Sequence, residues 1–75
     1  MMIYVLINTE MGSEREVLDA IKKINNVIEA HAVYGVYDFI AKIEAETMIK
    51  FKETVTWEIR RLNKVRSTLT MITIE

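Results

Sequence analysis

The sequence contains no cysteine, no proline, only two glycines and a single histidine among its 75 residues. The absence of cysteine excludes disulfide cross-links, thiol nucleophiles and the cysteine-rich zinc motifs. With His31 as the only imidazole, we do not expect a dedicated transition-metal site. We therefore expect no cofactor.

An excess of charge of one sign and long hydrophobic runs are also missing. The formal net charge is -1, and the charged residues, 28% of the chain, are spread along it. This balance excludes the basic footprint of a general nucleic-acid-binding protein. The apolar runs are too short to cross a bilayer, and Met1-Met2-Ile3 lacks the basic region of a signal peptide. We therefore expect a cytoplasmic protein without direct nucleic-acid or membrane binding.

What the sequence does contain is apolar residues, which make up 51% of the chain. A chain of this length forms one domain and buries only about 60% of its unfolded surface on folding. Its own core is thin, so the apolar excess predicts buried contacts between subunits.

The first half of the chain predicts a strand and a helix. Residues 2–7 form a continuous apolar run, typical of a strand covered on both faces. Ser13 and Glu16 have the spacing of a capping box, which would open a helix that ends near Asn25-Asn26.

The second half predicts two adjacent strands, a helix and a final strand. The two strands span residues 27–34 and 37–45. Glu46 or Thr47 would cap the helix, and the final strand covers residues 65–74. Apolar residues recur at helical spacing along the expected second helix: Met48, Phe51, Val55, Ile59 and Leu62.

This element order, β-α-β-β-α-β, predicts an α+β fold of the ferredoxin-like type. Right-handed crossovers then give a four-stranded antiparallel sheet with both helices on one face. We expect Ile40, Ile72 and Ile74 on the other, uncovered face. A second copy could cover that face and bury two sheets against each other.

The centre of the chain carries the most informative motif, Val33-Tyr34-Gly35-Val36-Tyr37-Asp38-Phe39. Gly35 predicts a tight turn that requires positive φ. Asp38 is an acid within an apolar segment, and two interpretations of it stay open. It is either a turn aspartate that accepts hydrogen bonds from backbone near Gly35, or a carboxylate that holds an ammonium group.

Thr68 and Thr70 are spaced by two, so both hydroxyls point to one face of the last strand. Ordinary strand propensity explains them equally well. Together with Asp38 and the backbone at Gly35, however, they would supply donors for a carboxylate and an acceptor for an amine. A ligand with both groups is an amino acid.

Other functions are less well supported by the residues. RNA-recognition motifs share this element order, but Asp38 stands where their third strand carries a basic-aromatic signature. The basic residues near the end of the second helix suit its negative pole: Arg60, Arg61, Lys64 and Arg66. A small dimeric α+β barrel enzyme with His31 or Asp38 as a proton-transfer residue is an alternative, although His31 fits a structural or interface role better. An oligomerisation module without ligand is a third.

The motif Gly35-Val36-Tyr37-Asp38-Phe39, with Thr68-Leu69-Thr70-Met71-Ile72 about thirty residues later, resembles the effector domain of the Lrp/AsnC family of prokaryotic transcription factors. This domain is also called the RAM domain. The resemblance covers the whole chain and implies the ferredoxin-like fold, sheet-to-sheet dimers, and rings of dimers. It implies no catalysis.

The resemblance also implies a ligand site. Small effectors, usually amino acids, would bind at the contact between neighbouring dimers, near the Gly-x-Tyr-Asp turn of one subunit. Gly35 would offer backbone groups, Asp38 would bind the amine, and Thr68 and Thr70 would serve the carboxylate or line the pocket. Tyr37 and Ile72 would flank the effector side chain.

Two departures from the family pattern bear on function. Full-length members carry an N-terminal helix-turn-helix domain, whereas this chain starts with the first strand. We therefore expect residues 1–75 to be a single effector domain, either stand-alone or excised from a longer protein, that regulates transcription with a full-length relative. The connection before the last strand, often Leu-Pro-Gly-Val in the family, reads Leu62-Asn63-Lys64-Val65 here, and we expect this to alter rigidity more than function.

Overall fold

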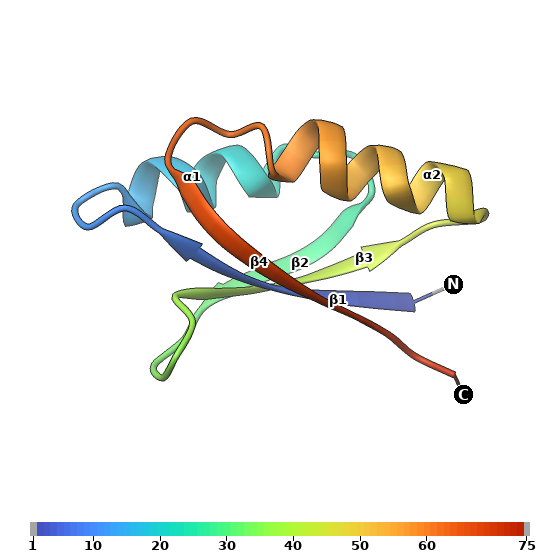
Figure 1. The fold of residues 1–75 in the computed structure, drawn as a ribbon, viewed down its shortest axis with the longest axis horizontal. Coiled ribbons are helices and arrows are strands. Elements are labelled where there is room, and N and C mark those ends of the chain that lie inside the picture. Colours follow the sequence, from blue (N-terminus) through green and yellow to red (C-terminus); the bar gives the residue numbers. More distant parts are fainter. Residues whose placement is uncertain (1, 75) are drawn as a thin grey trace.

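The computed structural model describes residues 2–74, so residues 1 and 75 of the predicted domain lie outside the described part. Its element order confirms the predicted α+β, ferredoxin-like fold (Figure 1). The elements are β1 Met2–Thr9, α1 Glu14–Lys22, β2 Val27–Ala32, β3 Phe39–Glu44, α2 Met48–Glu53, its π-helical continuation Thr54–Ile59, and β4 Val65–Ile72.

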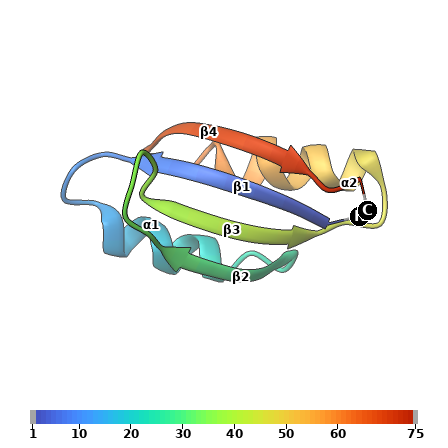
Figure 2. The same cartoon turned by 90° about the horizontal axis from the view of Figure 1, so that it is seen from below.

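The four strands form one antiparallel sheet in the order β2-β3-β1-β4. Both helices pack on the same face, as the side view and the view from below agree (Figures 1 and 2). No helix within residues 2–74 has the length and apolar character needed to span a membrane.

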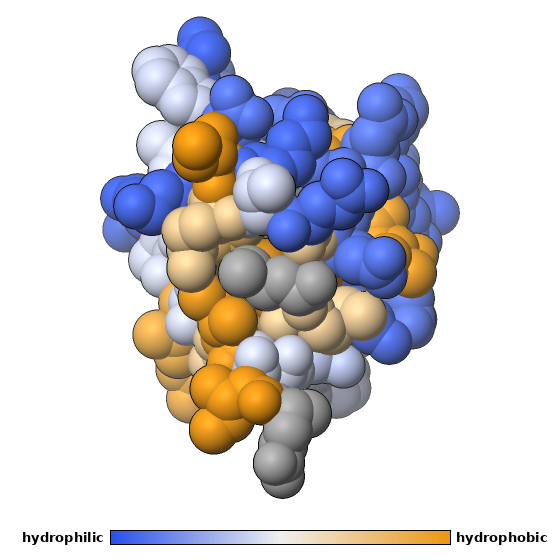
Figure 3. Space-filling view, turned by 90° about the vertical axis from the view of Figure 1, so that its right-hand side faces the viewer, coloured by the Kyte–Doolittle hydropathy of each residue, from blue (hydrophilic) through white to orange (hydrophobic). Residues whose placement is uncertain are grey.

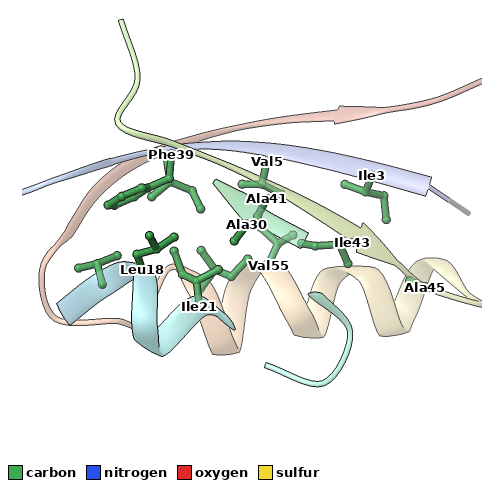
Figure 4. Close-up of a cluster of buried hydrophobic side chains, with 13 residues drawn as sticks. Ile3, Val5, Leu18, Ile21, Ala30, Phe39, Ala41, Ile43, Ala45 and Val55 are labelled. Atoms are coloured by element: carbon green, nitrogen blue, oxygen red, sulfur yellow. The ribbon is translucent and has the colours of Figure 1, made fainter. Parts of the chain in front are cut away.

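The core lies between this sheet and the helices (Figure 4). Alternate residues of β1 point into it, and its other buried side chains come from β2, β3, α1, the second helix and Ala45 just after β3. Full burial of one aliphatic or aromatic side chain stabilises the fold by about 1.5–3 kcal/mol. The largest fully buried side chains are Phe39, Ile3, Ile7, Ile21, Ile43 and Ile59.

The helix boundaries differ in part from the sequence prediction. Thr47 does cap α2, because its hydroxyl accepts a hydrogen bond from Lys50 N at 3.1 Å. The predicted capping box at Ser13 was wrong, because the Ser13 side chain makes no cap hydrogen bond. The backbone of Ser13, with φ of -105° and ψ of 11°, also lies outside the extended region that an N-cap residue uses. Helix α1 also ends at Lys22, because the chain must already turn back to enter β2 at Val27.

The second helix widens into π-helical turns after Glu53, a feature that apolar spacing does not predict. Arg60 N donates to Val55 O at 2.9 Å, a bond that spans five residues. The expected apolar stripe is largely confirmed: Val55 and Ile59 are buried, Phe51 and Leu62 pack against the core, and Met48 is exposed.

The connection between β2 and β3 is a loop of residues 33–38, longer than the predicted tight turn. It is closed by a hydrogen bond from Val33 N to Asp38 O at 2.9 Å. Gly35 adopts φ of 135°, so the prediction that this glycine takes positive φ is confirmed.

Gly35→Val is expected to destabilise the protein by about 1–3 kcal/mol, because this backbone region is nearly exclusive to glycine. A Cβ built at Gly35 meets no atom within 4 Å, so the cost is in the backbone and not in packing. Chemical denaturation measures it. Tyr34→Val places the same side chain at a neighbour without positive φ, and an equal loss there would refute the explanation.

The sheet face opposite the helices, called the open face below, carries an apolar cluster. Strand register aligns Leu6 with Ile40 on one side and with Leu69 on the other, and aligns Tyr4 with Met71. Residues directly opposite each other share a face. Figure 3 shows the sheet side as largely apolar and the helix side as largely hydrophilic.

Only part of the open face was predicted correctly. Ile40 lies there as expected, but Ile72 does not, because it pairs with Ile3, whose side chain points into the core. Ile74 lies beyond the end of β4 and is almost fully exposed. Leu69 and Met71 lie on the open face instead of Ile72. The register between β4 and β1 decides which alternate residues of β4 face the helices and which face away from them.

Candidate functional site

Asp38 lies half-buried immediately before β3 and binds the end of β1. Its Oδ2 accepts a hydrogen bond from Thr9 N at 2.9 Å, and its own N donates to Ile7 O at 3.0 Å. The carboxylate therefore contacts a strand distant in sequence instead of the backbone near Gly35, which the turn interpretation expected. Its second oxygen leaves acceptor capacity for a ligand.

Thr9 connects this loop to the segment that precedes β4. Its hydroxyl donates to Lys64 O at 2.8 Å, and Glu10 N donates to the same oxygen at 2.9 Å. Lys64 Nζ lies 3.6 Å from Glu10 Oε2. The bonds from Asp38 through Thr9 to Lys64 thus hold three segments in a fixed arrangement at one end of the sheet.

Asp38→Ala is expected to destabilise the protein by about 1–3 kcal/mol, because it leaves the part-buried Thr9 N–H without an acceptor. If the carboxylate only held a ligand, the substitution would instead spare the fold. Asp38→Asn keeps an acceptor oxygen and should lose less. Urea titration of both variants checks the order, and equal stability of Asp38→Ala and wild type would contradict it.

The other residues of the predicted loop site lie in the same loop as Asp38. Tyr37 is half-buried and Gly35 is exposed, as are the flanking side chains of Tyr34 and Val36. The loop projects from the sheet on the side away from the helices (Figure 1).

Thr68 and Thr70 lie on the opposite side of the sheet, toward the helices. They pair with Ile7 and Val5, whose side chains are in the core. Both threonines are half-buried and line a groove of about 460 Å³ between the second helix and β4. Ile72 faces the same side at 40% exposure but does not line the groove.

One copy of the chain therefore does not assemble the six predicted site residues into one pocket. Gly35, Tyr37 and Asp38 belong to the projecting loop, while Thr68, Thr70 and Ile72 belong to the edge strand. Strand β1 separates the two groups in the sheet.

The basic residues near the end of the second helix occupy separate places. Arg60 terminates the helix, as the dipole interpretation predicted, and Arg61 lies over the Trp57 ring at 5.4 Å from its centroid. Arg60 and Arg66 line the groove with the threonines. Sequence reasoning missed this role, although Arg66, Thr68 and Thr70 alternate along one strand.

His31 lies at the open face and binds a neighbouring acid. Register pairs it with Ile40, and its ring nitrogen Nε2 lies 3.0 Å from Glu29 Oε1. The pKa of Glu29 is held below its usual value, mainly by the hydrogen bond to His31 and to a lesser extent by the positive charge of Lys42. Within residues 2–74 no group of three or more acidic or imidazole side chains could hold a metal ion.

The fold, a four-stranded antiparallel sheet with two helices on one face, is that of a known class of small ligand-binding domains. The sequence profile described as the Lrp/AsnC ligand binding domain matches residues 2–75, and the chain belongs to this family. The family is regulatory and non-enzymatic, which removes the small-enzyme alternative. Its RAM domains bind small effectors and oligomerise.

Solved structures agree with this assignment. FFRP-DM1 is 37% identical with a TM-score of 0.94, and the match covers 97% of each chain. The hypothetical protein PHS023 from Pyrococcus horikoshii is 36% identical with a TM-score of 0.91, over 99% of this chain and 89% of that one. No curated protein sequence gives a significant match.

The fold also recurs within longer regulators. The transcriptional regulator NMB0573 from Neisseria meningitidis, solved as a complex with L-Met, is 14% identical with a TM-score of 0.88. The match covers 99% of this chain but only 49% of that protein.

Proposed function

We propose that residues 1–75 act as a single effector-binding and oligomerisation unit that binds an amino acid between subunits. In this proposal the unit works in the cytoplasm and modulates transcription together with a full-length Lrp/AsnC regulator. The observation that carries the proposal is the separation of the loop residues from the β4 residues on opposite sides of the sheet. Two copies can bring such halves together.

The open face supports the assembly part of the proposal. Its apolar cluster consists of Tyr4, Leu6, Ile40, Leu69 and Met71, and Leu69 and Met71 are 46% and 48% exposed in the single chain. A second copy related by a two-fold axis would bury this cluster against itself. Dimers of this kind would then associate further into ring-like oligomers, which place a loop beside a neighbour's groove.

The chemistry of the two halves supports an amino acid as effector. Asp38 would accept the ammonium group through the oxygen that Thr9 does not use, and the backbone at Gly35 would contribute further groups. Thr68 and Thr70 would bind the carboxylate, while Tyr37 and Ile72 flank the side chain. The L-Met complex of NMB0573 is consistent with this ligand class.

Regulation follows from the position of such a site. An effector that contacts two subunits has different affinity for the assembled and the separate states, so it shifts the equilibrium between them. The full-length partner would supply the contact with DNA, since this chain lacks a basic footprint.

A ligand-free structural module is the second candidate function. It is favoured by one observation, the bond from Thr9 N to Asp38 Oδ2, which gives the acid a structural role without any ligand.

A thermal-shift screen of the standard amino acids separates the two candidates. A ligand that binds only the native state at about 100 times its Kd stabilises it by about 2.7 kcal/mol. We expect one or a few amino acids to raise Tm, and we expect Asp38→Asn to abolish the response while staying folded. If the oligomeric wild type responds to none, the structural module is the better account.

A further inference from the structure

We infer that the effector is an acidic amino acid whose side-chain carboxylate binds between Arg60 and Arg66. The inference rests on the proposed function and assigns a ligand class to that site. Its basis is the set of hydrogen-bond donors along the groove beside β4, which exceeds the need of a single carboxylate.

The charged side chains that line the groove are both positive. Two guanidinium groups reach it and no acidic side chain does; the lining residues are Val55, Arg60, Val65, Arg66, Ser67, Thr68 and Thr70. In the described part of the chain, neither arginine has a carboxylate within ion-pair distance. The nearby Lys64, in contrast, is paired with Glu10 at 3.6 Å. Within residues 2–74, the two positive charges in the groove therefore have no counter-charge.

The threonine hydroxyls of the groove are free as well. Among residues 2–74, neither Thr68 nor Thr70 uses its hydroxyl in a hydrogen bond with the protein. Four other threonines do, and they are Thr9, Thr47, Thr54 and Thr73. Ser67 is different, because Asn8 Nδ2 lies 3.5 Å from its hydroxyl and pairs with it across the strands.

Backbone donors add to this set. Thr73 N donates to Met2 O at 3.0 Å, and bonding to a neighbour alternates along an antiparallel strand. The residues of β4 that bond to β1 are consequently Met71, Leu69 and Ser67, and the N–H groups of Thr68 and Thr70 point to the free edge of the sheet. One carboxylate can bind these hydroxyls and N–H groups without using either arginine.

A second carboxylate accounts for the arginines. Each guanidinium offers donors in a planar fork that matches a carboxylate, and two negative charges on the ligand would balance the two positive ones. Val55, buried, and Val65, half-buried, form an apolar wall that strengthens these interactions. The volume of about 460 Å³ holds a small amino acid.

The test compares ligands that differ only in side-chain charge. Isothermal titration of the wild-type oligomer with L-glutamate and L-glutamine, and with L-aspartate and L-asparagine, is performed at equal ionic strength and neutral pH. We expect at least one acid to bind about tenfold or more tightly than its amide, the effect of one charge-assisted hydrogen bond.

Matched variants assign the preference to the groove. Arg60→Gln and Arg66→Gln should each weaken binding of the acid about tenfold and reduce its advantage over the amide. Both side chains are exposed, so the fold should tolerate these changes. Arg61→Gln removes an equal positive charge at a position outside the groove, over the Trp57 ring. It should change the affinity for the acid by less than about twofold.

The outcomes separate this inference from the proposed function. If amides or apolar amino acids bind as tightly as the acids, the acidic class is wrong and an amino-acid effector remains. If Arg61→Gln weakens binding as much as Arg66→Gln, the groove assignment is wrong. If no amino acid binds to the assembled protein, both the inference and the proposed function fail.

Discussion

Phe39→Ala is expected to cost about 3–5 kcal/mol of folding free energy, because it removes a large buried side chain and leaves a cavity. Phe39 is 1% exposed and lies where β3, β1 and α1 meet (Figure 4). Domains have only about 5–15 kcal/mol of stability in total, and a 75-residue chain has a thin core. We expect a large fraction of the variant to be unfolded at physiological temperature.

Denaturant unfolding followed by circular dichroism measures this loss. Tyr34→Ala is the control, since it also truncates an aromatic side chain but at a fully exposed position in the loop. Its effect should stay within about 0.5 kcal/mol. A Phe39→Ala variant as stable as Tyr34→Ala would mean that the core is not arranged around β3 as described.

Leu6→Lys is expected to separate the subunits without unfolding them. Leu6 occupies the centre of the apolar row on the open face, between Ile40 and Leu69. In a two-fold dimer the new charge would be buried opposite its own copy, which costs about 3–5 kcal/mol of association free energy. In the monomer the lysine can extend its ammonium group into water. Light scattering should therefore report monomers with unchanged secondary structure.

The matched control for this substitution lies on the other side of the molecule. Thr56→Lys adds the same charge at an exposed position of the second helix, away from the open face. The Thr56→Lys variant should still form at least a dimer. If Leu6→Lys retains the wild-type mass, the open face is not the subunit interface, and the proposed assembly is wrong.

Sequence patterns predicted the helices and strands because the formation of each depends on residues close together in the sequence. The alternation in β3, the helical stripe in the second helix and the Thr47 cap each depend on residues a few positions apart. Pattern reasoning failed where distant segments decide the outcome. The side of β4 that faces the helices depends on its register with β1, and so Ile72 was misplaced and Leu69 was missed at the open face.

The candidate site was predictable to a similar extent. The positive φ of Gly35 follows from the residue itself, and the shared face of Thr68 and Thr70 follows from their spacing. The hydrogen-bond partner of Asp38 could not be predicted from the sequence, because Thr9 lies 29 residues away and is brought next to Asp38 by the pairing of β1 with β3. The groove role of Arg66 likewise depends on how the second helix packs beside β4.

Assembly is the first requirement of this account, since the loop half and the groove half of the proposed site face different sides of one chain. The most direct measurement is the mass of the wild-type particle by light scattering at micromolar concentration. The account predicts a dimer or a larger multiple of the 8.8 kDa chain. A monomer of 8.8 kDa across this concentration range would contradict it.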